Sequence, residues 1–283
     1  MFKTLKMDLY RLFRSKGLLV TLIIFFGMTF LSAYFECDER AYFMENQDTC
    51  TTYVYDEASD DYVEILAKDS DEPLYSEDKL SNFFLFGEIM SNNLSTITFA
   101  AIFSLIFASA EISTGFIKNL ANYKGFRVYT VFSKSIISVI ISILLILTGI
   151  ISASIGSMIW LGYIHFDTSE LFNHFCYYAV WSILAGIFCM VVNLIYLLTK
   201  NIAITMALAV LSTVNLLEFI ARGIEGYFKL SNEPLQNSLL TFQMNSLSFA
   251  PDISFIYAAV VGGAYLVVIG IISVILMKNK DIR

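Results

Sequence analysis

The sequence predicts an all-α integral membrane protein with six transmembrane helices, an amino-terminal interfacial helix and a small β-containing extracellular insertion. Of the 283 residues, 57% are hydrophobic and 15% are charged, and the mean hydropathy is +0.68. This apolar content exceeds what one soluble core of that size buries. Six apolar stretches also reach the length of roughly 17 to 25 residues that crosses a hydrocarbon core of about 30 Å. They are residues 17–35, 83–110, 131–163, 176–198, 202–217 and 255–277.

Residues 1–16 are predicted to form a cytoplasmic interfacial amphipathic helix. Apolar residues recur at helical spacing there, and basic side chains beside them gain free energy near anionic lipid. The apolar positions are Phe2, Leu5, Leu9, Leu12 and Phe13, and the basic positions are Lys3, Lys6, Arg11 and Arg14. A solvated basic tail is the alternative. The next segment, 17–35, is predicted to be a retained span, because an acidic stretch without a small-residue cleavage pattern follows it.

The distribution of Lys and Arg predicts that both termini are cytoplasmic. Basic loops remain on the cytoplasmic side of a membrane. Thirteen of the eighteen Lys and Arg residues lie before the first span, in or beside the loop 111–130, between the fourth and fifth spans, or in the tail 278–283. The loop between the third and fourth spans has none, which agrees with an outside position.

Residues 36–82 are predicted to form an acidic extracellular domain. Fifteen of the twenty-five carboxylates lie between Glu36 and Asp78. Two segments rich in β-branched and aromatic residues, 51–55 and 62–66, predict a hairpin. Since an isolated hairpin is marginally stable, Cys37 and Cys50 are a candidate disulfide at its base, with two free thiols as the alternative. The negative field also suggests capture of cationic peptides, with a merely solvated acidic loop as the alternative.

No motif in the sequence predicts catalysis by this chain. It has no GxxxxGK[ST] phosphate loop, and its two His residues and four Cys residues lack zinc-site spacing. Glu218 and Arg222 stand one helical turn apart, which leaves a membrane protease conceivable, but an ion pair at this spacing is usually structural. We expect no catalytic residue, no metal site and no cofactor bound by this chain.

Polar residues in or near the predicted spans are candidates for a substrate path. They are Glu88, Asn92, Asn93, Asn193 and Asn215. The alternatives are that the first three mark the water interface and that the last two form interhelical hydrogen bonds. Pairs of small residues four apart predict close helix packing or dimerisation. These pairs are Gly149 with Ala153, Ser152 with Gly156, Ala258 with Gly262, and Ala259 with Gly263. Residues 218–254, interrupted by Pro234, are predicted to form re-entrant helices on the outer face.

The cytoplasmic segment 111–130 is predicted to dock against a partner protein. The chain leaves the second span at the acidic Glu111 and meets Gly115, whose backbone reaches angles closed to other residues. It then restarts as a short amphipathic helix with the sequence Ile117-Lys118-Asn119-Leu120. A helix held in this way between two spans forms a rigid knob that a partner can push.

The motif and the topology together resemble the permease subunits of type-2 ATP-binding-cassette (ABC) exporters. That superfamily includes bacitracin-resistance, lantibiotic-immunity and related multidrug permeases. The shared features are the basic amino-terminal helix, six spans, a large first outside loop, re-entrant helices after the fifth span, and the ending Met277-Lys278-Asn279-Lys280-Asp281-Ile282. The motif consists of the acidic residue, the glycine and Ile117 to Leu120, followed by Tyr129 and by Ser133-Lys134 at the start of the third span.

The resemblance implies a function, partners and a location. The segment resembles a coupling helix, so the residues implied in ATPase contact are Glu111, Gly115, Phe116, Lys118 and Asn119. The chain would be a bacterial cell-membrane permease that exports an amphipathic peptide or lipid-like antimicrobial. ATP and Mg would bind a separate ABC ATPase subunit, and a second permease subunit, identical or related, would complete the pore. Its surroundings are the lipid bilayer, and no nucleic acid is involved. The alternative function is a membrane sensor or scaffold whose acidic ectodomain binds a ligand without transport.

Overall fold

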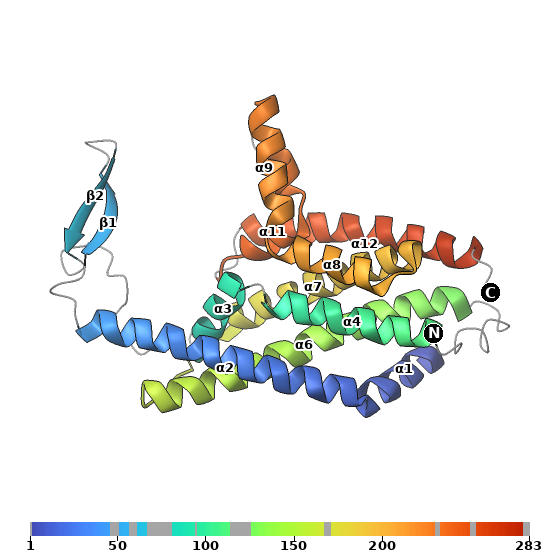
Figure 1. Cartoon of the computed structure of the whole chain (residues 1–283), viewed down its shortest axis with the longest axis horizontal. Helices are drawn as coiled ribbons and strands as arrows, with labels where there is room; N and C mark the ends of the chain where they lie inside the picture. The colour runs from blue at the N-terminus through green and yellow to red at the C-terminus, as the bar shows by residue number, and fades with distance from the viewer. Residues whose placement is uncertain are drawn as a thin grey trace. The chain divides into compact units, whose positions relative to one another are not determined.

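The computed structural model describes residues 2–45, 51–56, 61–66, 81–93, 95–113, 126–166, 171–229, 233–249 and 253–279. The described chain is mostly helical (Figure 1). Its elements are α1 (Phe2–Arg14), α2 (Lys16–Glu45), β1 (Thr51–Asp56), β2 (Asp61–Leu66), α3 (Asn82–Asn93), α4 (Ser95–Ser113), α6 (Phe126–Trp160), α7 (Leu171–Thr199), α8 (Ile202–Thr213), α9 (Leu216–Phe228), α10 (Pro234–Asn237), α11 (Leu240–Asn245) and α12 (Ile253–Asn279).

Several helices are long and apolar enough to cross a membrane. Within the described residues these are parts of α2, α6, α7 and α12, namely Lys16–Tyr42, Phe132–Trp160, Leu171–Thr199 and Ile253–Leu276. The pair α8 and α9 adds a fifth crossing if the two helices are one broken span. The helical, multi-pass membrane character predicted from composition is therefore confirmed.

The predicted second span, 83–110, is divided between α3 and α4. The apolar part of α4, Thr96–Ala110, is shorter than a spanning helix, and α3 covers only Asn82–Asn93. The described helices thus provide four spans, or five with the bent pair, where the sequence predicts six. A sixth crossing requires α3 and α4 to serve together as one interrupted span.

The chain divides into two compact units, and α7 lies at the centre of the first. This unit comprises Met1–Phe25, Met90–Thr148 and Ser169–Arg283. In it α7 packs against α4, α8, α11 and α12, and Trp181 of α7 is 2% exposed. A Cβ atom at Gly186 would stand 2.4 Å from Cγ2 of Val139. The absence of a side chain at Gly186 therefore allows α6 and α7 to approach closely.

Two residues in left-handed backbone conformation determine where α7, α8 and α9 meet. Lys200, with φ 54°, ends α7, and Asn201 caps α8 by accepting a hydrogen bond of 3.2 Å from the backbone N–H of Ile204. Asn215, with φ 58°, separates α8 from α9, and Asn tolerates this conformation better than most residues. The helices bend by 62° at this break (Figure 1). The apolar helix therefore ends at Thr213, four residues before the predicted end of the fifth span at 217.

The second unit contains a two-stranded hairpin and a helical cluster. It comprises Phe26–Ile89 and Gly149–Thr168. Strands β1 and β2 pair antiparallel, from Thr51 opposite Leu66 to Asp56 opposite Asp61. In the cluster, the Trp160 ring of α6 packs 4.7 Å from the Phe30 ring of α2, measured between centroids. Helix α2 itself continues to Glu45, ten residues beyond the predicted end of the first span at 35.

Asn82 attaches the start of α3 to the segment that follows α6. Its backbone N–H donates to the carbonyl of His165 at 2.8 Å, and its Oδ1 accepts from the backbone N–H of His165 at 2.8 Å. Its Nδ2 also donates to Oγ of Ser157 at 2.7 Å. Asn82 is fully buried, so these bonds satisfy polar groups that have no access to water.

Candidate functional site

The described residues beside the predicted coupling segment form the best-defined candidate site. Glu111 lies in the last turn of α4, and its side chain is not described. Gly115, Phe116, Lys118 and Asn119 lie outside the described residues. Their contact with an ATPase therefore stays a prediction. The residues that flank the segment in α4 and α6 are described, and α1 lies against them.

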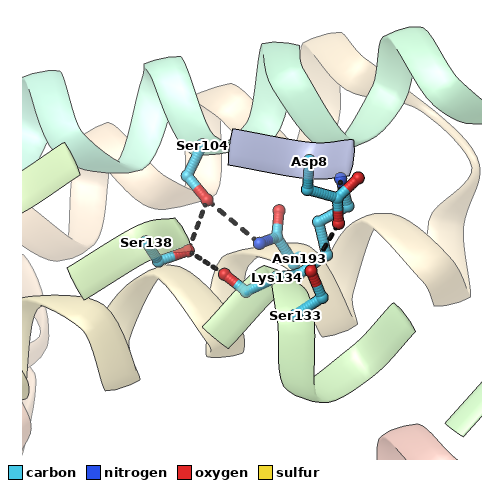
Figure 2. A network of polar contacts seen from close by, with 6 residues as sticks. All are labelled: Asp8, Ser104, Ser133, Lys134, Ser138 and Asn193. Carbon is cyan, nitrogen blue, oxygen red and sulfur yellow. Dashed lines mark hydrogen bonds and ion pairs between the residues drawn. The ribbon is translucent and has the colours of Figure 1, made fainter. Parts of the chain in front are cut away.

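Asp8 of α1 forms a buried ionic contact with the first part of α6. Its side chain is almost completely buried, with the residue 1% exposed. Oδ2 accepts a hydrogen bond from Oγ of Ser133 at 2.5 Å and lies 3.7 Å from Nζ of Lys134 (Figure 2). Sequence reasoning identified Ser133 and Lys134 as part of a motif but overlooked Asp8. The sequence does contain a feature that sets Asp8 apart, since it is the only acidic residue before Glu36.

Helix α1 presents two different faces. Thr4, Asp8 and Leu12 recur at four-residue spacing and are buried, because residues four apart lie on one side of a helix. Phe2 and Phe13 are 80% and 63% exposed. Leu12, predicted to face lipid, therefore packs inside the protein, whereas these two phenylalanines leave an apolar surface outside it.

Phe107 of α4 joins the same contact through its aromatic ring. The Nζ atom of Lys134 lies 4.2 Å from the ring centroid, and the guanidinium carbon of Arg11 lies 5.7 Å from it. Both distances fall within the range of cation–π attraction. Asp8, Lys134 and Phe107 therefore join α1, α6 and α4 at one place, which we call the Asp8 site.

A chain of hydrogen bonds continues from Lys134 into the helical core. The carbonyl of Lys134 accepts from Oγ of Ser138 at 2.9 Å. The hydroxyls of Ser138 and Ser104 lie 2.9 Å apart, and Nδ2 of Asn193 donates to Oγ of Ser104 at 3.0 Å (Figure 2). The amide nitrogen of Asn193 thus makes a hydrogen bond between α7 and α4. Interhelical hydrogen bonding is the alternative to a role for Asn193 in a substrate path. Its Oδ1 is buried without a hydrogen-bond partner.

The other predicted site residues are dispersed. Glu88 lies half-buried on α3, and Asn92 and Asn93 end that helix, but the side chains of these two asparagines are not described. Asn215 is exposed between α8 and α9 and accepts from Nδ2 of Asn245 at 3.5 Å. The substrate path therefore stays a prediction.

The cysteine prediction is likewise untested. Cys37 lies buried in α2, and Cys50 lies outside the described residues. A disulfide between them therefore stays a prediction.

Two further predictions concern metal-ligating side chains and the pair Glu218 and Arg222. No cluster of three or more His, Cys, Asp or Glu side chains that could hold a metal occurs among them. Glu218 is 8% exposed, while Arg222 is exposed. Glu218 and Arg222 do not form a close ion pair in the described part of the chain.

Comparison with known proteins identifies no family. No protein-family model matches the chain, and no curated protein matches it significantly. The likeness to type-2 ABC permeases therefore depends on the order of the elements and on the motif around Gly115.

Proposed function

We propose that this chain is the transmembrane permease subunit of an ABC exporter in a bacterial plasma membrane, with both termini cytoplasmic. It moves an amphipathic peptide or lipid-like antimicrobial, and a separate ATPase subunit hydrolyses the ATP. Six crossings arise if α3 with α4 forms one interrupted span and α8 with α9 ends in a re-entrant turn. Two permease subunits and two ATPase subunits complete the transporter.

The observation that supports this proposal best is the Asp8 site. In this proposal the ATPase pushes on the segment between α4 and α6. That push moves the spans only if the helix ends on either side of the segment are fixed to neighbouring helices. Asp8 and Lys134 provide such a hold, because a buried ion pair with an added hydroxyl bond resists separation. The pair joins the amino-terminal helix α1 to α6. Its partner on α6, Lys134, lies eight residues after the start of α6 at Phe126.

The hydrogen bonds beyond Lys134 suggest how motion passes inward. Ser138, Ser104 and Asn193 connect α6 with α4 and α7, and α7 also packs against α8, α11 and α12. ATP and Mg belong to the partner ATPase in this proposal, because the sequence carries no phosphate-binding loop.

The decisive experiment is reconstitution with the ATPase that copurifies with the chain. We expect substrate-stimulated ATP hydrolysis in the complex. Gly115→Pro and Lys118→Glu should reduce ATPase association or stimulated hydrolysis and leave membrane insertion intact, since charge reversal at a contact costs a few kcal/mol. Lys200→Glu is the matched control, because it makes the same charge reversal at an exposed residue between α7 and α8. Normal assembly and hydrolysis in both test variants would refute the coupling role, and ligand binding without stimulated hydrolysis would favour the sensor alternative.

A further inference from the structure

Helices α9 and α10, which pack against each other, carry a second group of buried polar side chains. On α9, Glu218 and Glu225 are 8% and 4% exposed and lie on the same side as the buried Ala221. On α10, Gln236 is 2% exposed. The opposite side of α9 is apolar and exposed, with Phe219 at 75% and Tyr227 at 83%. The carboxylates of this amphipathic helix therefore face the protein interior.

Glu225 uses only one of its two oxygens in hydrogen bonding. Oε1 accepts from the backbone N–H of Leu235 at 2.5 Å and from the backbone N–H of Gln236 at 3.0 Å. Oε2 of the same carboxylate is buried and has no partner. These bonds hold Glu225 against α10 and orient the second oxygen.

The unpartnered atoms in this region are all oxygens. Six buried side-chain atoms without a partner occur among the described residues, and three of them are Oε1 of Glu218, Oε2 of Glu225 and Oε1 of Gln236. Glu225 and Gln236 are in direct contact through the bond between Gln236 N–H and Oε1 of Glu225. Two residues in contact through the backbone of Gln236 therefore each carry a buried oxygen without a hydrogen-bond partner, and one of them is a carboxylate.

The chemistry that completes such a site is a cation that donates hydrogen bonds. A buried carboxylate is costly unless a positive charge or donors compensate it, and no Lys or Arg among the described residues forms an ion pair with Glu225. The described residues offer no group of three metal ligands. An ammonium or guanidinium group supplies both positive charge and several N–H donors.

We propose that Oε2 of Glu225 and Oε1 of Gln236 bind an ammonium or guanidinium group between α9 and α10. Glu218 extends the acceptor surface two helical turns earlier on the same side of α9. Because the site is buried, the ligand enters when α9 separates from α10 and then stabilises their contact. A role of this site in recognising the cationic end of an exported amphipathic molecule rests on the proposed function. Binding of an ammonium or guanidinium group does not depend on the proposed function.

The first test uses two isomeric cations and the full-length protein in phosphatidylcholine nanodiscs. n-Butylammonium and tetramethylammonium have the same formula and charge, but only n-butylammonium carries N–H donors. We expect saturable binding of n-butylammonium by calorimetry, with a rise in the unfolding midpoint, and no saturable binding of tetramethylammonium. Equal responses to both cations would overturn the proposal, because they would reflect non-specific charge.

Variants locate the binding to Glu225. Glu225→Gln keeps an acceptor for Leu235 and Gln236 and places an amide donor where Oε2 lies, so the fold should persist and n-butylammonium should bind at least roughly tenfold more weakly. Glu233→Gln is the matched control, since it removes the same charge from an exposed side chain next to α10, and its binding should be unchanged. Gln236→Glu adds a carboxylate and should tighten binding.

The remaining outcomes are equally decisive. Unchanged affinity in both Glu225→Gln and Gln236→Glu, or no saturable binding by the unmodified protein, would overturn the site. If Glu225→Gln does not fold, the affinity of Gln236→Glu for n-butylammonium decides whether the site exists. A lysine-rich peptide and phosphatidylethanolamine nanodiscs distinguish a peptide source of the ammonium group from a lipid source. Absence of saturable n-butylammonium binding by the unmodified protein, together with intact stimulated ATP hydrolysis, would refute the site and leave the proposed function standing.

Discussion

At the scale of single residues, Asp8 has the clearest consequences. A carboxylate among basic residues at the start of the chain is easily taken for an exposed charge, yet it is 1% exposed and lies beside Lys134. An ion pair of this kind adds little net stability, but removal of one partner leaves the other charge buried and uncompensated. The two residues should therefore depend on each other.

Asp8→Ala and Lys134→Ala should show this dependence in a double-mutant cycle. We expect each single variant to lower stability in detergent and the double variant to lose less than the sum, with a coupling free energy of about 0.5–3 kcal/mol. Thermal unfolding and denaturant titration measure it. Lys6→Ala, an exposed change on the same helix, should not couple to Lys134→Ala. Additive losses for Asp8 and Lys134 would contradict the contact.

The predicted small-residue pairs separate into buried and open positions. A Cβ atom at Gly149 would lie 2.1 Å from Cε2 of Phe86, whereas one at Gly263 would meet nothing within 4 Å. Gly149→Ala should therefore destabilise the protein by about 1–3 kcal/mol through overpacking. Gly263→Ala should be neutral or stabilising, by at most about 1 kcal/mol from helix propensity. Melting curves of the two variants provide the measurement, and equal effects would contradict this packing.

At the scale of elements, the hairpin has an unusual distribution of charge at its tip. The strand register pairs Asp56 with Asp61, and the sequence between them adds Glu57 and Asp60. Like charges at paired strand positions are destabilising. A tip that retains them is consistent with the hypothesis that this segment gathers cationic peptides.

Neutralisation of Asp56, Glu57, Asp60 and Asp61 to amides tests the hypothesis. We expect weaker binding of a cationic peptide at low salt and lower cellular resistance, because exposed charges act over a Debye length of about 8 Å at physiological ionic strength. Binding to the unmodified protein should also weaken as salt rises. Asp56→Glu with Asp61→Glu keeps the charge and should bind normally. No effect of neutralisation or salt would leave the loop with no electrostatic role in capture.

At the scale of the whole molecule, orientation depends on charge distribution rather than on internal contacts. Thirteen of eighteen Lys and Arg residues fall on the side that we infer to be cytoplasmic. The acidic segment and the loop without Lys or Arg fall on the other side. The coupling role and the capture role both require this orientation.

Cysteine labelling in intact cells tests the orientation. In a background without the natural cysteines, Asp60→Cys should react with an impermeant thiol reagent, and Lys124→Cys should react only after permeabilisation. Labelling in permeabilised cells shows that both thiols are reactive. The reverse pattern would contradict the topology and, with it, the proposed function.

Composition and periodicity alone determine that this chain is a helical membrane protein. Burial of apolar surface scales with area and does not depend on which partner covers it, so runs such as 131–163 and 176–198 predict long apolar helices wherever they pack. The same local information locates the motif around Gly115 and the acidic segment. It does not reveal that Asp8 meets Lys134.

Tertiary structure decides the features that depend on residues far apart in the chain. Local sequence alone is compatible with more than one structure at each of three places. They are the division of the predicted second span into α3 and α4, the buried face of α1, and the contact of Glu225 with α10. Asn215 illustrates this, because its left-handed conformation ends α8 within an apolar sequence that local propensity alone would continue. A helix ends and a carboxylate becomes buried only where packing and hydrogen bonds from other elements compensate the free energy lost.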